Sequence, residues 1–229
     1  AFLFHVDHHA DFFLTYDNLI DEQEKIKNTD MKKMTDFVQK KLPVDNSEFI
    51  VPAMYKGIIG DAISVSRENR SLYGTLEDGS YKTTKKAWFK DRKGKIHNFF
   101  LCGSIYGLTG HNGLLTDEYN NFDVRQAFRK NHRKRNVILD IDLDFFTYRD
   151  DEDGAWAMNE RHLETILSSE AFNFLWSSAE VVTIALEPYY CGFEAECIFI
   201  LDKMNSIVLN KCGLDIKEKV TQQFGFSNK

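Results

Sequence analysis

Short runs of consecutive apolar residues alternate along this chain with longer segments in which apolar residues recur every three or four positions. Residues 1–4, 137–142 and 179–186 have the length and composition of buried strands. Residues 159–176 carry an apolar stripe typical of an amphipathic helix, and residues 193–211 are predicted to form the last long helix. Strands that alternate with helices in this way predict an α/β fold with a mostly parallel sheet.

The segments between these elements give further predictions. Residues 16–41 indicate a charged helix that is broken near residues 28–30, and a short helix over 52–59 is expected to precede a strand. Between residues 67 and 102 the chain is punctuated by glycine, and Lys93-Gly94 indicates the turn of a β-hairpin. We expect this hairpin to be an excursion from the main sheet of a single domain that spans the whole chain.

Composition narrows the class of protein. At 229 residues, of which 43% are hydrophobic, the chain can bury the core of one domain. Its net charge of −6 argues against general nucleic-acid binding, and no apolar stretch approaches the ~20 residues of a membrane span. The four cysteines lack CxxC spacing, which predicts reduced core thiols in a cytoplasmic protein and argues against a zinc–thiolate site.

Two acidic clusters follow the first and second of the predicted strands. They are Asp7-His8-His9-Ala10-Asp11 and Asp140-Ile141-Asp142-Leu143-Asp144. Extended backbone would place alternate residues of each cluster on one face. Because the carboxyl ends of parallel strands meet at one edge of a sheet, the two clusters are expected to lie close together. Carboxylates gathered there repel one another strongly, and divalent cations are the expected compensation.

The two clusters contain enough ligands for two ions that share bridging carboxylates. The predicted metal ligands are Asp7, His9, Asp11, Asp140 and Asp142. Carboxylates and imidazole favour Mn²⁺, Zn²⁺, Mg²⁺ or Fe²⁺, and a set without thiolates favours manganese. Two ions about 3.5–4 Å apart can deprotonate a bridging water and so provide hydroxide for hydrolysis at neutral pH.

Four nearby polar residues are not among these predicted ligands. Asp144 either supports the ligands or caps the loop that follows it, and His8 faces away from His9 by strand parity. His5 lies deeper in its strand, where a hydrogen-bonded core role is expected. Glu187 ends a very apolar strand, where it either meets a metal, a cation or a substrate or is buried with hydrogen bonds to backbone amides.

Taken in order along the chain, these elements resemble the ureohydrolase (arginase) superfamily. Asp7-His8-His9-Ala10-Asp11 is similar to that family's D-x-H-x-D metal motif, and Leu139-Asp140-Ile141-Asp142 is similar to its D-x-D motif. Glu187-Pro188 falls where the family carries a glutamate that holds the substrate guanidinium. The peptide arginases and their relatives look most similar, because the ordered match extends from residue 5 to about residue 192.

The resemblance implies a three-layer α/β fold, two Mn²⁺ ions and hydrolysis of arginine within a peptide to ornithine and urea. By position, one ion would be bound by Asp7, Asp11 and Asp140, and the other by Asp7, His9, Asp140 and Asp142. Asp11 would also orient the hydroxide, and Glu187 would bind the guanidinium. Relatives are commonly oligomeric, so a homo-oligomer such as a trimer is expected.

The chain departs from the family pattern in two places. The family's first ion also takes a histidine from a loop that precedes the first motif strand, and the sequence starts at that strand. The family's proton-shuttle histidine has no match, because no histidine lies between His9 and His97. His111 is the candidate replacement, with a surface role as the alternative.

These departures leave two other functions open. One is a deacetylase-like amidohydrolase on the same scaffold, although Glu187 suits a cationic substrate better than a neutral amide. The other is a metal-binding interaction protein that has lost catalysis. Retention of all the visible carboxylate ligands argues against this second alternative.

Overall fold

The structure is a computed structural model. It describes residues 1–9, 11, 21–23, 25–27, 29–41, 49–66, 72–75, 81–84, 86–91, 93–102, 136–149 and 156–209. His111 and the final residues of the predicted last helix lie outside these ranges. Within them, no helix has both the length and the apolar character needed to cross a membrane.

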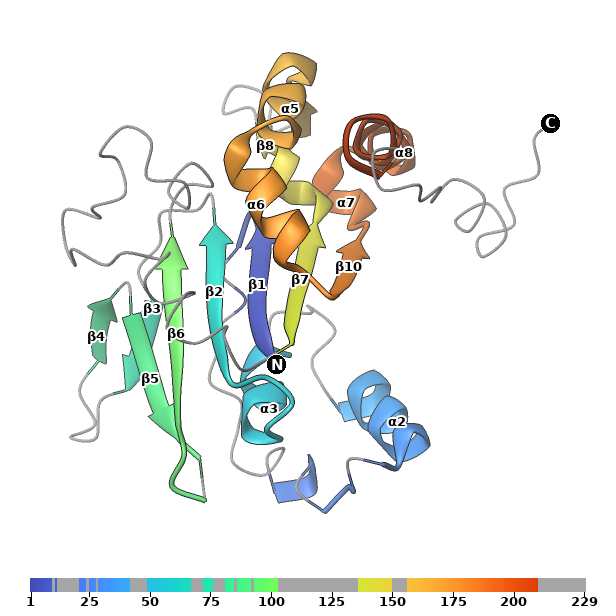
Figure 1. The fold of residues 1–229 in the computed structure, drawn as a ribbon. Coiled ribbons are helices and arrows are strands. Elements are labelled where there is room, and N and C mark those ends of the chain that lie inside the picture. The colour runs from blue at the N-terminus through green and yellow to red at the C-terminus, as the bar shows by residue number, and fades with distance from the viewer. Residues whose placement is uncertain are drawn as a thin grey trace.

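The centre of the fold is a six-stranded sheet in the order β10-β7-β1-β2-β6-β5 (Figure 1). Its strands are β1 (Phe2–Asp7), β2 (Asp61–Ser66), β5 (Lys86–Lys90), β6 (Ile96–Cys102), β7 (Val137–Asp142) and β10 (Val181–Ala185). Five of them run parallel, and only the edge strand β5 is antiparallel to its neighbour. The predicted α/β fold with a mostly parallel sheet is therefore confirmed.

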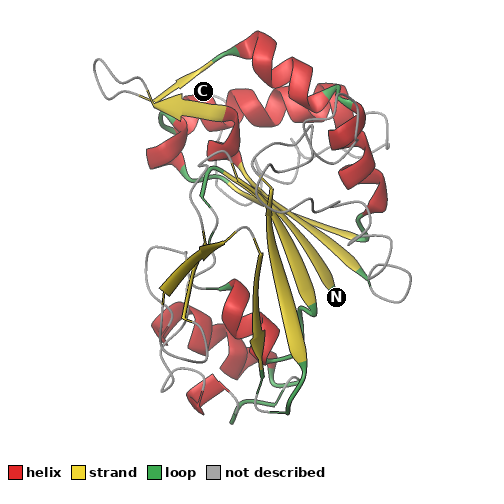
Figure 2. Cartoon of the chain, turned by 90° about the vertical axis from the view of Figure 1, so that its left-hand side faces the viewer, coloured by secondary structure: helices red, strands yellow, loops and turns green. Residues whose placement is uncertain are grey.

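Helices cover both faces of this sheet, which gives the predicted three layers (Figure 2). Phe4 and Val6 of β1 belong to a core that includes α5 (Glu160–Leu167), α6 (Glu170–Ser178) and α8 (Glu194–Met204). Leu3, which points to the opposite face, packs with α3 (Ile50–Tyr55) in a smaller core. Because side chains alternate along a strand, His5 and Asp7 share the α3 face with Leu3.

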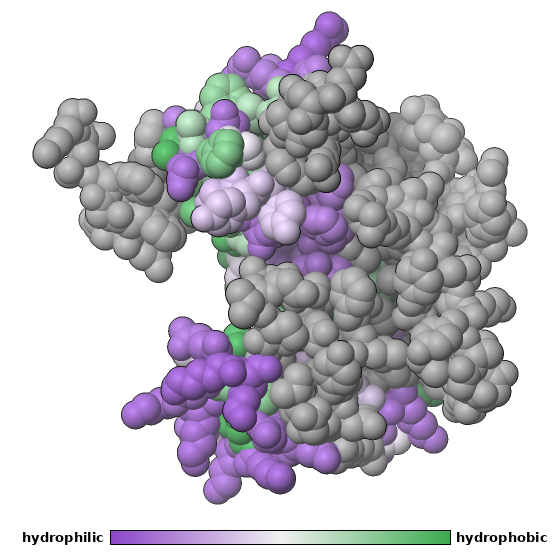
Figure 3. All heavy atoms as spheres, turned by 180° about the vertical axis from the view of Figure 1, so that it is seen from behind, coloured by the Kyte–Doolittle hydropathy of each residue, from purple (hydrophilic) through white to green (hydrophobic). Residues whose placement is uncertain are grey.

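The charged segment before α3 is helical only in parts, as predicted. A helical turn at residues 21–23 is followed by turns, and α2 (Met31–Lys41) begins directly after Asp30. Lys33 and Lys40 form ion pairs with Asp30 and Asp36 at 3.1 and 2.9 Å. Helix α2 lies at the hydrophilic corner at the lower left of Figure 3, which is a solvated helix surface.

The predicted hairpin turn at Lys93-Gly94 is present, and it joins two strands of the main sheet. Gly94 has φ +80, and its N–H donates to the carbonyl of Asp91 at 2.9 Å between antiparallel β5 and β6. Strand β6 also pairs in parallel with β2, so the hairpin extends the main sheet. A separate antiparallel pair is formed by β3 (Leu72–Thr75) and β4 (Tyr81–Thr84).

The remaining elements lie near the carboxyl edge of the sheet or in the last helical region. They are the 3₁₀ helix η2 (Leu143–Phe146), the antiparallel pair β8 (Thr147–Arg149) and β9 (Trp156–Met158), α7 (Pro188–Cys191) and the π-helix η3 (Asn205–Leu209). Strand β10 was predicted to be buried, but it forms one edge of the described sheet and alternates between exposed and half-buried residues. Cys191 and Cys197 are buried free thiols, as predicted for them.

The predicted single helix over residues 159–176 is wrong, because the structure has two helices there, α5 and α6. The break falls at Ser168 and Ser169, although the apolar stripe continues across it through Leu163, Ile166, Leu167 and Phe172. Ser169 is the N-cap of α6, and its hydroxyl accepts a hydrogen bond from the backbone N–H of Phe172 at 3.1 Å. A local cap therefore ends one helix and starts the next.

Replacing Ser169 with alanine should lower the free energy of unfolding by about 1 kcal/mol, because the first turn of α6 loses its capping acceptor. Urea denaturation of the two proteins measures this difference. Ser177→Ala is the matched control, since Ser177 lies within the same helix and is exposed. Equal midpoints for Ser169→Ala and Ser177→Ala would contradict the capping role.

Candidate metal centre

The strand register places polar side chains in two rows on the α3 face of the sheet. The first row, in strand order, consists of Ser64, His5, Asp140 and Thr183. The second row lies two residues further toward the carboxyl edge and contains Ser66, Asp7 and Asp142. These rows bring the two acidic clusters of the sequence together, as the parallel arrangement predicts.

The residues after Asp7 converge on the same place through a loop and not through strand parity. Strand β1 ends at Asp7, and Asp11 has a left-handed backbone with φ 47. The backbone N–H of His9 donates to Asp7 Oδ1 at 2.9 Å, and the Ser66 hydroxyl donates to the carbonyl of His8 at 2.8 Å. These bonds turn the chain back over the end of β1, so Asp11 returns to the level of His5.

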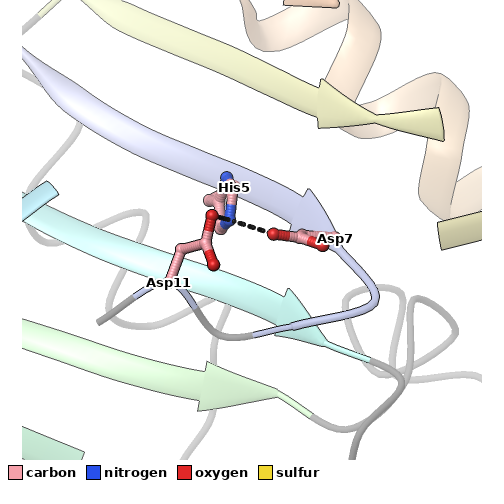
Figure 4. A group of neighbouring side chains, drawn as sticks. All are labelled: His5, Asp7 and Asp11. Atoms are coloured by element: carbon pink, nitrogen blue, oxygen red, sulfur yellow. Dashed lines mark hydrogen bonds and ion pairs between the residues drawn. The ribbon is translucent and has the colours of Figure 1, made fainter. Parts of the chain in front are cut away.

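His5, Asp7 and Asp11 form the first group that could hold a metal ion (Figure 4). His5 Nε2 lies 2.9 Å from Asp7 Oδ2 and 3.7 Å from Asp11 Oδ2. His5 and Asp7 are buried, and 14% of the Asp11 side chain is exposed. The three side chains point toward one another, so their ligand atoms face a common space.

Asp7, His9 and Asp144 form a second such group. His9 Nδ1 lies 3.3 Å from Asp144 Oδ2 and 3.7 Å from Asp7 Oδ1. Asp144 is buried in η2, and its Oδ1 accepts the backbone N–H of His8 at 3.1 Å. Asp7 belongs to both groups and offers one oxygen to each. This is the arrangement that a bridging carboxylate requires.

Asp140 and Asp142 are close to these groups without belonging to either. Asp140 Oδ2 lies 2.9 Å from His5 Nδ1, and its Oδ1 accepts a hydrogen bond from the Thr183 hydroxyl. Asp142 caps η2 by accepting the backbone N–H of Asp144 at 3.2 Å. Asp142 is therefore the N-cap of η2 and is hydrogen-bonded to Asp144, a member of the second group.

Glu187 lies at the carboxyl end of β10, near Asp142. It has a left-handed backbone with φ 39, is half-buried, and its side chain does not cap α7. The preceding carbonyl, that of Leu186, accepts hydrogen bonds from the thiols of Cys191 and Cys197 at 3.2 and 2.8 Å. The turn is thus held in place, and Glu187 contributes negative charge to the environment of Asp142.

The charges of this region strongly perturb its proton equilibria. Burial, together with the charges of neighbouring carboxylates, raises the pKa of Asp11 to about 8 and that of Asp142 to about 9. Hydrogen bonds to Asp144 and Asp7 raise the pKa of His9 to about 11. Burial opposes the charged form of His5, but hydrogen bonds to Asp140 and Asp7 raise its pKa to about 10. Carboxylates thus outnumber the imidazoles that could neutralise them, and a divalent cation fits this surplus.

Sequence reasoning underestimated two residues. Asp144 was expected to support the ligands or to cap a loop, and it lies against Asp7 and His9 as a group member. His5 is hydrogen-bonded and buried as expected, but it too lies among the possible ligands. Its shared parity with Asp7 was the available signal. His111, the predicted proton donor, lies outside the described residues.

Carboxylate and imidazole donors suit a hard or borderline cation, so the chemistry of the site fits metal binding. A scan of family models finds none that matches this chain, and a search of curated proteins finds no match. The protein is thus characterised by its parallel α/β sheet and by the buried His/Asp groups near the carboxyl ends of the strands.

Stabilisation of the protein by Mn²⁺ should increase with pH. In the metal-free folded protein Asp11 and Asp142 have pKa values of about 8 and 9. In the unfolded chain both carboxyl groups release their protons near pH 4. Their contribution to the free energy of unfolding therefore falls as the pH rises from about 4 to these folded-state values. A bound cation requires the ionised carboxylates, and its affinity should rise by up to about tenfold per pH unit for each proton displaced. Thermal unfolding with and without Mn²⁺ at pH 6 and pH 8 tests this, and equal shifts of Tm at the two pH values would contradict it.

Proposed function

We propose that this chain is a metal-dependent C–N hydrolase that converts arginine residues of a peptide to ornithine and releases urea. The observation that carries the proposal is the position of Asp7, which lies in both His/Asp groups at the carboxyl edge of the sheet. The ordered resemblance of the sequence to the peptide arginases supports the same substrate. Glu187, which follows strand β10, supplies a negative charge near Asp142.

The proposed centre holds two divalent ions, with Mn²⁺ as the expected metal. Its residues are those predicted from the sequence, Asp7, His9, Asp11, Asp140 and Asp142, together with Asp144, which is added because it lies against His9. Bound divalent ions would supply Lewis acidity and a water that ionises near neutral pH. In this proposal Asp7 would help to hold both ions, and Asp11 would orient the attacking water.

Glu187 is the residue that selects the substrate in this proposal. A guanidinium group carries a permanent positive charge and presents paired N–H donors, which match the two oxygens of a carboxylate. A neutral acyl-amide has no such charge, so a glutamate at this position would contribute little to its binding. The half-buried position of Glu187 keeps the carboxylate within reach of a substrate side chain. This difference favours arginine over acyl-lysine.

The reaction balances with one water for each arginine. The C–N bond between the guanidinium carbon and the side-chain nitrogen breaks, and the carbon takes the water oxygen to become urea. The nitrogen takes both protons of the water and leaves as the ornithine ammonium group, so the positive charge passes from the guanidinium to ornithine. The peptide therefore loses CH₂N₂ in net composition. This change in mass identifies the reaction without any assumption about the sequence of the peptide.

The test is incubation of the Mn²⁺-loaded protein with a library of arginine-containing peptides, followed by mass spectrometry and a colorimetric assay for urea. Loss of CH₂N₂ together with an equal amount of urea is the expected result. Free arginine and acyl-lysine peptides are run in parallel, and protein treated with a chelator is the control. Deacylation of lysine without any urea would overturn the proposal in favour of the amidohydrolase alternative.

A further inference from the structure

Each nitrogen of the His5 ring lies near a carboxylate, and the two nitrogens have different partners. Nε2 faces Asp7 and Asp11, whereas Nδ1 faces Asp140 on the neighbouring strand. We propose that His5 is the imidazole ligand of one metal ion, bound through Nε2, and that Asp140 is a positioning residue that orients His5. This assignment rests on the two-metal centre of the proposed function and names the origin of its second imidazole.

The distances around Nε2 fit a shared cation. Metal–ligand bonds of about 2.1 Å place adjacent ligand atoms roughly 3.0 Å apart in octahedral geometry and roughly 3.4 Å apart in tetrahedral geometry. Nε2 lies 2.9 Å from Asp7 Oδ2 and 3.7 Å from Asp11 Oδ2, and the ligand atoms of the three residues all lie within 4.8 Å of one another. In Figure 4 the three side chains converge from β1 and from the loop that returns over it.

The contacts around Asp140 indicate a supporting role. Its Oδ2 is 2.9 Å from His5 Nδ1, and its Oδ1 accepts the hydroxyl of Thr183, so both oxygens already have partners. A ligating histidine commonly donates its second N–H to a carboxylate, which fixes the tautomer and the orientation of the ring. In the metal-bound protein Nδ1 would donate to Asp140, and Nε2, having lost its proton, would direct its lone pair at the space between Asp7 and Asp11. This positioning role replaces the ligand role that the sequence predicts for Asp140 in the proposed centre, and it differs from the bridging role that the family resemblance implies.

The surroundings of His5 favour a preorganised ligand. His5 and Asp7 are both in β1 and are 1% and 2% exposed, and the His5 ring meets Phe49 edge-on at a centroid distance of 5.6 Å. In the adjacent strand Ser64, which is level with His5, is fully buried, and its hydroxyl has no hydrogen-bond partner among the described residues. A buried hydroxyl of this kind is a hydrogen-bonding group for which the described residues supply no partner.

His5 also fills a gap in the sequence pattern. The resemblance expects the imidazole of the first ion to come from a loop before the first motif strand. In this protein β1 itself carries a histidine whose Nε2 faces two of that ion's predicted carboxylates. The chain can therefore complete the first site with residues of β1 and the loop after it.

Metal stoichiometry of purified variants tests the assignment. We expect two Mn²⁺ ions per wild-type chain by equilibrium dialysis with elemental analysis, and one for His5→Gln. Asp140→Asn should keep two ions but bind one of them about 10- to 100-fold more weakly, because the ring is no longer oriented. His162→Gln, on the exposed side of α5, is the matched control and should bind like the wild type. Two ions bound to His5→Gln with wild-type affinity would overturn the proposal.

A spectroscopic measurement keeps the test decisive if His5→Gln does not fold. Electron spin-echo spectra of the Mn²⁺-loaded protein report imidazole nitrogens coordinated to the metal. His9→Gln should retain such a coupling, which we assign to His5 Nε2, and loss of all nitrogen coupling in His9→Gln would contradict that assignment. Wild-type protein that binds no Mn²⁺ would refute the metal centre itself, whereas normal stoichiometries without urea release would refute only the proposed substrate.

Discussion

Replacing Asp7 with asparagine should abolish binding of both metal ions and reduce the rate of urea release by about a thousandfold or more. Asp7 offers Oδ2 to the group with His5 and Asp11, and Oδ1 to the group with His9 and Asp144. A neutral amide is a much poorer ligand than a carboxylate and cannot serve two cations. Asp7→Asn should therefore reduce metal binding and the rate of urea release more than substitution of a residue that belongs to only one group. Elemental analysis and the urea assay measure the two effects together.

The comparison with Asp36→Asn separates this effect from a general loss of charge. Asp36 lies on α2, where it is paired with Lys40, and it is exposed. Asp36→Asn should therefore keep both ions. Asp7→Asn should also lower the free energy of unfolding of the metal-free protein by about 3 kcal/mol, because the buried His5 loses a charged partner. Retention of even one tightly bound ion by folded Asp7→Asn would contradict the shared role.

The strands at the centre of the fold could be predicted because short, continuous apolar runs between polar segments are typical of buried parallel strands. Strands β1 and β7 follow the pattern closely, since both faces of a central strand are covered. The division between α5 and α6 could not be predicted in the same way. The cap at Ser169 is a local hydrogen bond, and periodicity is insensitive to it when the apolar stripe continues. The side chains of β10 are exposed because this strand lies at the edge of the described sheet. The amino-acid composition of a strand does not show whether it lies at the edge or in the centre.

The same contrast applies to the candidate site. The sequence indicates which residue types meet at the carboxyl edge, because parallel strands bring their ends together. It does not indicate how the loop after Asp7 turns, and the strand parity assumed for His9 and Asp11 does not apply, because β1 ends at Asp7. The left-handed backbone of Asp11 brings that carboxylate back to His5, so two residues assigned to different roles become neighbours. Which oxygen of Asp140 meets which partner likewise requires coordinates.

Replacing Glu187 with glutamine should reduce kcat/KM for arginine peptides by roughly two to three orders of magnitude while leaving the metal content unchanged. The substitution preserves the size of the side chain and removes the charge that pairs with a guanidinium group. The backbone of the turn should persist, because the thiols of Cys191 and Cys197 donate hydrogen bonds to the carbonyl of Leu186. These two hydrogen bonds do not involve the side chain of Glu187. A loss of this size without loss of metal is the expected signature of a substrate contact.

Glu180→Gln is the matched control, because Glu180 directly precedes the same strand and is exposed, so it should retain wild-type kinetics. Two outcomes would assign Glu187 a different role. Loss of an ion in Glu187→Gln would make this residue a metal ligand, since its charge already reaches Asp142. Unchanged kcat/KM with a lower unfolding midpoint would make it a structural residue of the β10 turn. Only a fall in kcat/KM with both ions and the midpoint retained supports a guanidinium-binding role, because a charge that acts on the substrate alone leaves the resting protein unaltered.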